Sequence, residues 1–179
     1  MLVVVVLVVL GGSGQDSPAT AARAPKAKRT PPARVSWILE GSSLQALREH
    51  NAGLARRFFN NPETFVIGTA EDQNMVPHGY RAIPTRAYTS LRAFEADLHH
   101  GRIAPPIGAV IYDPEAWART PIAEQHAPVA AMRRFARLAG KWGYGQILAP
   151  GRDLALADGA CAKRDGELLD AAYLRCGLT

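Results

Sequence analysis

The alternation of strand-like and helix-like stretches is the feature that most constrains what this chain can fold into. Four short apolar runs have the composition of buried strands, at residues 35–39, 64–69, 108–112 and 144–149. Apolar residues recur at helical spacing in the stretches between and after them, at residues 42–58, 91–98, 129–142 and 168–173. Strands that alternate with helices pair in parallel through right-handed crossovers. The sequence therefore predicts an α/β fold made of parallel β/α units.

The number of these units predicts half of a barrel. A TIM-type (β/α)8 barrel has eight units and takes roughly 250 residues, whereas this chain has 179 residues and four predicted units. We therefore expect residues 35–179 to form the first half of such a barrel. A half-barrel leaves its sheet edge uncovered, so it can form a homodimer if it is complete, adopt an open sheet or be a truncated product.

Two long connections follow predicted strands, at residues 70–89 and 113–127. Both leave the carboxyl end of a strand, which is the edge where parallel α/β proteins build their ligand sites. A structureless stretch of this length is uncommon unless it carries function. The alternative is that residues 79–88 contain a short strand.

The first 34 residues differ in character from the rest. Residues 2–10 are uniformly aliphatic, and a helical run of that length spans only about half of a bilayer core. We interpret residues 1–12 as a signal-peptide-like segment, with a candidate cleavage site at residues 19–21, and residues 13–34 as a flexible, basic, Pro-rich linker. A buried strand is the alternative for the apolar run. This interpretation predicts a secreted or extracytoplasmic protein that meets the membrane only through its N-terminal segment.

The net charge of +5 comes mostly from that N-terminal stretch. Residues 1–34 hold five basic residues and one acidic residue, while the remainder holds 16 basic and 15 acidic residues. A nucleic-acid-binding domain needs clustered positive charge on its folded part. The sequence therefore predicts no nucleic-acid partner.

Cys161 and Cys176 are the two cysteines of the chain. An even number of cysteines in an exported protein predicts a disulfide. The alternative is a pair of reduced thiols that pack as small apolar side chains. A zinc site is poorly supported, because no histidines lie at ligand spacing from the two thiols.

Polar side chains follow the predicted strands where each strand ends. They are Glu40 after the first strand, Glu71 after the second, Asp113 and Glu115 after the third, and Arg152 and Asp153 after the fourth. In a parallel barrel these positions converge on one mouth. Two carboxylates across a mouth divide acid and base roles, about 5–5.5 Å apart in retaining glycosidases and about 6.5–9.5 Å apart in inverting ones. We expect Glu40, Asp113 and Glu115 to be catalytic.

The other candidates are assigned to substrate binding. They are Glu71 and His78 in the long second connection, Tyr112 and Trp117 around the Asp-Pro-Glu sequence, and Arg152 and Asp153. Plainer interpretations stay open: Asp-Pro-Glu is common at helix starts and in turns, and Glu40 can neutralise a helix N-terminus. Arg152 and Asp153 can form an ordinary ion pair, and His78 can be an exposed loop residue.

No cofactor or metal is predicted. The chain has no phosphate-binding loop, zinc-protease motif, nucleophile elbow or dinucleotide-binding glycine pattern. A metal held by Asp113, Glu115 and His78 would have no diagnostic spacing.

Four segments carry a resemblance to known proteins. They are VSWILEG at 35–41, ETFVIGTAEDQNMVP at 63–77, VIYDPEAW at 110–117 and ILAPGRDL at 147–154. Over roughly residues 35–179 the chain resembles secreted bacterial proteins of uncharacterised function that look like (β/α)8 barrels and continue well beyond this length. The resemblance implies export and a barrel fold, and it brings no catalytic residues.

Three functional hypotheses follow. The first is the amino-terminal part of an exported, glycosidase-like barrel that uses carboxylate acid–base chemistry. The second is a noncatalytic barrel that binds a carbohydrate or another small molecule. The third is a truncated interaction protein whose open sheet edge pairs with another chain.

Overall fold

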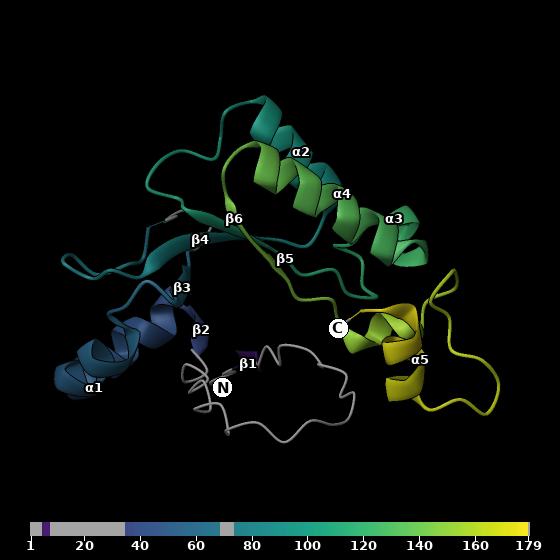
Figure 1. Cartoon of the computed structure of the whole chain (residues 1–179), viewed down its shortest axis with the longest axis horizontal. Helices are drawn as coiled ribbons and strands as arrows, with labels where there is room; N and C mark the ends of the chain where they lie inside the picture. The colour runs from purple at the N-terminus through teal and green to yellow at the C-terminus, as the bar shows by residue number, and fades with distance from the viewer. Residues whose placement is uncertain (1–4, 8–34, 69–73, 179) are drawn as a thin grey trace, which may run out of the picture.

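The computed structural model describes residues 5–7, 35–68 and 74–178. Within them, five parallel strands pair in the order in which they occur in the chain, and together they form a curled half-barrel (Figure 1). The strands are β2 (Ser36–Glu40), β3 (Thr64–Ile67), β4 (Ile83–Tyr88), β5 (Ala109–Tyr112) and β6 (Gly145–Leu148). The predicted α/β class, the parallel pairing and the likeness to the first half of a β/α barrel are confirmed.

A sixth strand lies at the other edge of this sheet. Strand β1 (Val5–Leu7) pairs antiparallel with β2, with Val5 opposite Ile38 and Leu7 opposite Ser36. Strand pairing is the alternative that the sequence left open for this apolar run. The candidate cleavage site and the linker at 13–34 lie outside the described residues, so the signal peptide stays a prediction.

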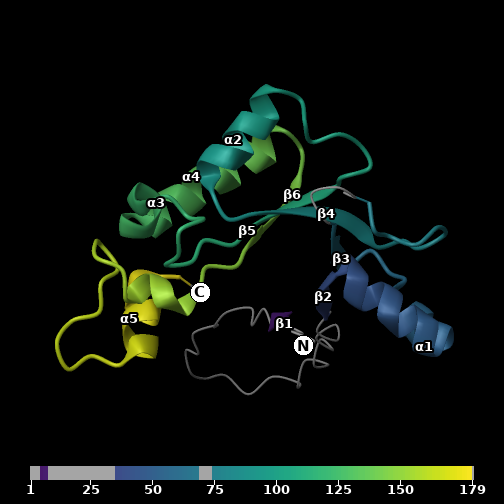
Figure 2. The same ribbon diagram turned by 180° about the vertical axis from the view of Figure 1, so that it is seen from behind.

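Helices α1 (Gly41–Phe59), α2 (Leu91–His99) and α4 (Pro128–Lys141) pack on the convex side of the sheet, as Figures 1 and 2 show from opposite directions. Helix α3 (Ile122–His126) packs on α4, while the 3-10 helix η1 (Arg152–Ala155) and α5 (Leu169–Cys176) follow β6 and pack on each other. Local sequence signals explain several ends. The Ser90 hydroxyl caps α2 by accepting from the Ala93 N–H at 3.3 Å, and Gly177 ends α5 in the left-handed conformation. No helix in the described part of the chain is both long enough and apolar enough to cross a membrane.

Strand β4 corrects the expected helix–strand order. The connection at 70–89 is not one loop leading to a helix, because Ile83–Tyr88 pairs with β3 on one side and β5 on the other. The hidden strand within 79–88 is therefore confirmed. No helix is found in the described residues between β3 and β4. Instead Met75, Val76 and Tyr80 pack into the apolar cluster between α1 and strands β2 and β3.

The larger apolar core lies between the second half of the sheet and its helices. Val110 and Tyr112 of β5 point into it, together with Phe94 of α2 and Phe135 of α4. The Phe135 ring stacks on Tyr112 with centroids 5.1 Å apart and lies 4.4 Å from Phe94. Burial of large aromatic rings is the main stabilising contribution in such a layer. Because Tyr112 faces the helices, its neighbours Ile111 and Asp113 face the concave side.

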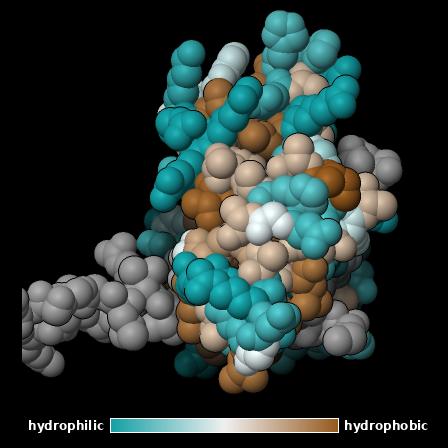
Figure 3. All heavy atoms as spheres, turned by 90° about the vertical axis from the view of Figure 1, so that its right-hand side faces the viewer, coloured by the Kyte–Doolittle hydropathy of each residue, from teal (hydrophilic) through white to brown (hydrophobic). Residues whose placement is uncertain are grey.

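The β6 edge of the sheet is less covered than its centre. Strand β6 pairs only with β5 in the described structure, and its residues are exposed or half-buried. Several leucines at this end are also exposed, with Leu156 at 65%, Leu168 at 77% and Leu174 at 62% of their surface. Figure 3 views the molecule from the side of α5 and shows hydrophobic residues among hydrophilic ones on this surface.

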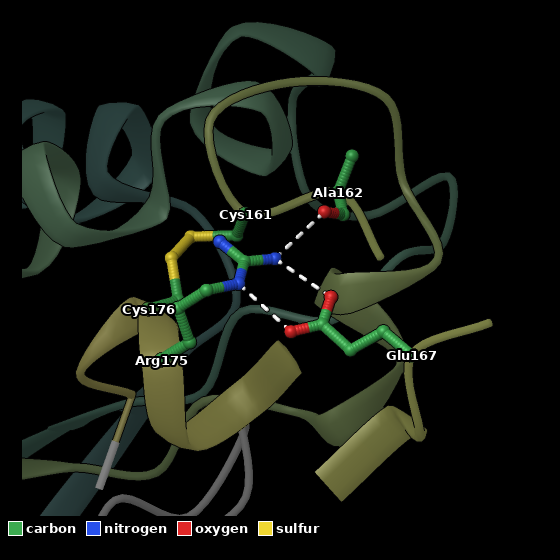
Figure 4. The surroundings of a disulfide bond; sticks show 5 residues. All are labelled: Cys161, Ala162, Glu167, Arg175 and Cys176. Atoms are coloured by element: carbon green, nitrogen blue, oxygen red, sulfur yellow. Dashed lines mark hydrogen bonds and ion pairs between the residues drawn. A yellow bond between two sulfur atoms is a disulfide. The ribbon is translucent and has the colours of Figure 1, made fainter. Parts of the chain in front are cut away.

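A disulfide closes the C-terminal segment. Cys161 and Cys176 are joined with their Cα atoms 5.4 Å apart, which confirms the predicted pair. Figure 4 shows the Arg175 guanidinium beside this bond, donating to the Glu167 carboxylate at 2.9 and 3.0 Å and to the Ala162 carbonyl at 2.9 Å. These donors hold the pKa of Glu167 well below its usual value, at about 2. The loop between the two cysteines is thus closed by both covalent and ionic contacts.

Candidate functional site

Three carboxylates gather just beyond the carboxyl ends of β5 and β6. Asp113 directly follows β5, Glu115 comes two residues later, and Asp153 lies in η1 after β6. Backbone hydrogen bonds fix these positions, because the Asp113 N–H donates to the Tyr88 carbonyl and the Gly151 N–H donates to the Pro114 carbonyl, both at 2.8 Å. The sequence placed all three at strand ends, and the structure brings them together.

Asp113 has the strongest perturbation in this group. Burial, first, and the negative charges of Glu115 and Asp153, second, together raise the pKa of Asp113 from the usual value near 4 to about 6. A carboxyl group with such a pKa carries its proton through mildly acidic conditions. It can therefore donate that proton to a leaving group.

Asp153 is held by only one of its two carboxylate oxygens. Its Oδ2 accepts from the Ala116 N–H at 3.0 Å, which ties η1 to the loop after β5. Its Oδ1 is buried and has no hydrogen-bond partner among the described residues. A buried carboxylate oxygen without a donor costs free energy. Such costs are tolerated where they serve function rather than stability.

Gly151 permits the close approach of these groups. A Cβ at this position would lie 2.8 Å from Cγ of Glu115 and would also overlap the Asp153 carboxylate. Its φ of −64° is open to any residue, so the requirement for glycine here is one of space.

Trp117 lies in the same loop and remains partly accessible, at 37% exposure. Its indole N–H donates to the Thr120 hydroxyl at 3.1 Å, and the Arg119 guanidinium stacks 4.9 Å from the ring centroid. The loop does not cap a helix at Asp113, because the next helix, α3, begins only at Ile122. The helix-start interpretation of the Asp-Pro-Glu sequence is therefore wrong.

Glu40 lies apart from the acidic cluster. It is exposed at the end of β2, and two strands separate β2 from β5. At about 4.8 Å per neighbouring pair, the two strands are roughly 14 Å apart along the sheet. Glu40 is the N-cap residue of α1, and its side chain makes no capping hydrogen bond. A direct pairing of Glu40 with Asp113 is not what the structure supports.

Tyr112 does not line the mouth as expected. It is 0% exposed and points toward α2 and α4, where its hydroxyl donates to Oε2 of Glu124 at 2.6 Å. Burial and this hydrogen bond both raise the Tyr112 pKa. The expectation failed because alternation along β5 gives Ile111 and Asp113 the concave face and leaves Tyr112 on the other face.

Arg152 forms an exposed ion pair with Asp170 of α5 rather than with its neighbour Asp153. His78 is exposed in a turn between Met75, which packs beside Gly41, and Tyr80, which lies 5.8 Å from the Arg48 guanidinium. His78 therefore lies over α1, away from the three carboxylates. Glu71 falls outside the described residues.

Two residues that the sequence did not single out organise the loop after β5. Glu124 accepts from the N–H groups of Leu91 and Arg92 at 2.7 and 3.2 Å, at the start of α2. Gln125 donates to the carbonyls of Trp117 and Thr120 at 2.9 and 2.7 Å. A charged and a polar residue in a short helix give no sequence signal of their own, because their partners lie in other elements.

Other possible sites are weak. A surface depression of about 270 Å³ lies on α1, lined by Gln45, Arg48, Glu49 and Ala52, on a helix rather than at the strand ends. No three His, Cys, Asp or Glu side chains of the described residues are arranged to hold a metal ion.

No family model, curated protein or solved structure matches the chain. The function must therefore be argued from the carboxylate cluster itself.

Proposed function

We propose that this half-barrel belongs to a secreted, glycosidase-like hydrolase, in which Asp113 is the general acid. The observation that carries the proposal is the grouping of Asp113, Glu115 and Asp153 at the carboxyl edge of the sheet. This edge is where parallel barrels place their catalytic groups. A pKa of about 6 suits Asp113 to protonate a glycosidic oxygen.

The neighbouring residues supply complementary roles. Glu115, two residues from Asp113, serves as the nucleophile or as the base that activates water. Trp117 offers a partly exposed ring for stacking against a sugar. Further strands beside β6 would complete the mouth, and Glu40 would face substrate from the far side of the concave surface.

The disulfide supports an oxidising location for this activity. Disulfides persist in secreted and periplasmic proteins and are rare in the cytosol. Fractionation of the native host with an antibody against the chain tests this part of the proposal. Recovery of the protein in the cytosol with free thiols would count against export.

The catalytic proposal is tested by hydrolysis of a panel of nitrophenyl glycosides. We expect Glu115→Ala to remove turnover while the circular dichroism spectrum stays that of the wild type. Glu95→Gln is the matched control, because Glu95 lies on α2 and pairs with Arg134. Equal turnover in Glu115→Ala and the wild type would exclude Glu115. Saturable binding of a sugar without any turnover would replace catalysis with the carbohydrate-binding alternative.

The open edge of β6 favours a second candidate, an interaction role in which this edge pairs with another chain or a second copy. An unpaired, partly apolar edge strand is a template for such pairing. Sedimentation of the wild type should then show association that rises with concentration. Leu148→Lys on β6 should abolish it, while Leu54→Lys on α1, a leucine of similar exposure, should not. A wild type that is monomeric at every concentration contradicts this role.

A further inference from the structure

We propose that Thr120 is the positioning residue of the carboxylate site, fixing Glu115 and Trp117 against the end of the neighbouring strand. The inference rests on the proposed function of that site for its meaning, and on hydrogen-bond geometry for its evidence. Thr120 is only 1% exposed. It lies outside any helix or strand, in the turn between β5 and α3.

The Thr120 hydroxyl makes three hydrogen bonds. Its oxygen accepts from the Glu115 N–H at 3.1 Å and from the Trp117 indole N–H at 3.1 Å. Its proton is donated to the Thr89 carbonyl at 3.0 Å. A hydroxyl has one proton to donate and two lone pairs to accept with. Every hydrogen-bonding capacity of this group is therefore used, which leaves it no alternative orientation.

These three bonds join the loop to the sheet. Thr89 directly follows β4, and the Asp113 N–H is bonded to the Tyr88 carbonyl one residue earlier. The Thr120 hydroxyl thus fixes the loop to the same strand end that fixes Asp113. Glu115 is held at its own backbone and Trp117 at its indole nitrogen, so the bonds set the spacing of Glu115 from Asp113.

The backbone around Thr120 is also held by hydrogen bonds. Its N–H donates to the Trp117 carbonyl at 3.2 Å, and Gln125, 7% exposed, donates to the carbonyls of Trp117 and Thr120. Residues 115–120 are ordered by buried side chains instead of regular secondary structure. Removal of the Thr120 hydroxyl would leave the Glu115 N–H, the indole N–H and the Thr89 carbonyl without their shared partner. The loop would then relax and admit water between the carboxylates.

The test compares Thr120→Val, which keeps the shape and removes the hydroxyl, with Thr120→Ser, which keeps the hydroxyl. NMR follows the Trp117 indole N–H, assigned through Trp117→Phe, and the titration of the Asp113 carboxyl. In Thr120→Val we expect the indole resonance to move and the Asp113 pKa to fall by about one unit, a tenfold loss of proton affinity. Thr120→Ser should keep both values near those of the wild type.

Thr64→Val is the matched control. Thr64 is also a fully buried threonine, but its hydroxyl has no hydrogen-bond partner among the described residues. This change should alter neither signal. If Thr120→Val leaves both signals as unchanged as Thr64→Val does, Thr120 has no positioning role.

A measurement on the wild type covers the case in which Thr120→Val does not fold. The Glu115 amide and the Trp117 indole N–H should exchange with deuterium far more slowly than free amides and indoles. Exchange of both at free rates would overturn the inference. None of these signals requires a substrate, so an absence of glycoside hydrolysis would defeat the proposed function and leave the positioning role of Thr120 to be decided by the NMR data.

Discussion

Asp113 links the proposed chemistry to the stability of the fold. Its folded pKa of about 6 lies above the value near 4 of an unfolded chain, so the folded state binds this proton more tightly. The stabilisation from Asp113 is fully present below pH 4 and is lost as the pH rises through about 6. This dependence of stability on pH is opposite to that of a carboxylate in an ion pair, whose stabilisation is lost as the pH falls.

We therefore expect Asp113→Asn to stabilise the protein at neutral pH. The amide removes a charge that is buried beside Glu115 and Asp153, and the gain in unfolding free energy at pH 7 should be about 1–2 kcal/mol. The gain should shrink to nearly zero at about pH 3, where Asp113 is largely protonated in both the folded and the unfolded state. Urea unfolding at the two pH values measures it. A loss of stability at pH 7 would show that neither burial nor the neighbouring charges destabilise the ionised Asp113 in the folded state.

Gly151 sets the space that the carboxylates occupy. In Gly151→Ala the new methyl group would overlap Glu115 and Asp153, and we expect a loss of about 1–3 kcal/mol in stability together with a shift of the Asp113 titration. Gly140→Ala on α4 is the control, because nothing lies within 4 Å of its added Cβ. That change should stabilise the protein by up to about 1 kcal/mol. Similar thermal unfolding of the two variants would contradict the crowding at Gly151.

For single residues, the sequence indicates the three acidic residues of the site but not the residues that hold the surrounding loop in place. Asp113, Glu115 and Asp153 stand out because they directly follow apolar runs. Besides nearer partners, Thr120 and Glu124 bind groups at the start of α2 and the end of β4 that lie 31 to 34 residues away in the chain. Spacing along a sequence carries no signal for such contacts, because they depend on which strand ends become neighbours.

Among the elements, helix α2 is attached to β4 by a buried ionic network that the sequence did not suggest. Asp97 is 8% exposed and binds the Arg86 guanidinium at 2.8 Å, the Tyr88 hydroxyl at 3.2 Å and Arg102 at 3.4 Å. Burial is the main reason that the Tyr88 pKa is raised, which keeps its hydroxyl protonated as a donor.

We expect Asp97→Ala to destabilise the protein by about 3–5 kcal/mol, because it leaves the Arg86 charge without its buried partner. Glu95→Ala is the comparison, since Glu95 pairs with the exposed Arg134 on the same helix. A surface pair of that kind contributes only about 0–1 kcal/mol. If chemical denaturation shows equal losses of unfolding free energy in Asp97→Ala and Glu95→Ala, the Asp97 contacts contribute no more than a surface ion pair.

The sequence of β4 gives only a weak signal for a strand, because it contains a member of this network, Arg86. Its sequence, Ile-Pro-Thr-Arg-Ala-Tyr, lacks the continuous apolar character of a strand buried on both faces. Pro84 and Arg86 interrupt the run of apolar residues. The positive charge of Arg86 is compensated by its ion pair with Asp97 of α2. The other four parallel strands were found from their apolar runs alone.

For the whole molecule, the disulfide secures the last segment to the rest of the domain. The two cysteines are 15 residues apart, and closing a loop of that length stabilises by about 3 kcal/mol. The double variant Cys161→Ser, Cys176→Ser should therefore unfold at lower denaturant concentration by this amount. Equal stability of the wild type with and without reductant would mean that the bond does not contribute.

The half-barrel itself was predictable, because alternation of strands and helices determines parallel pairing. Alternation cannot show that the described residues between β3 and β4 contain no helix and that Met75, Val76 and Tyr80 supply the covering side chains there. Nor can alternation show that Tyr112 faces the helices. A strand buried on both faces has no alternation of polar and apolar residues that would indicate which residue faces which side.

The strict succession of strands also has a consequence for how the chain acquires its structure. Every parallel strand pairs with its predecessor in the sequence, from Trp37 beside Thr64 to Ala109 beside Gly145. Contact order is thereby kept low for a parallel sheet, and low contact order favours rapid folding. During synthesis, each parallel strand after β2 leaves the ribosome after the strand with which it pairs has already been made. The growing edge is then always the most recently made strand, and β6 is the last of them in the described sheet.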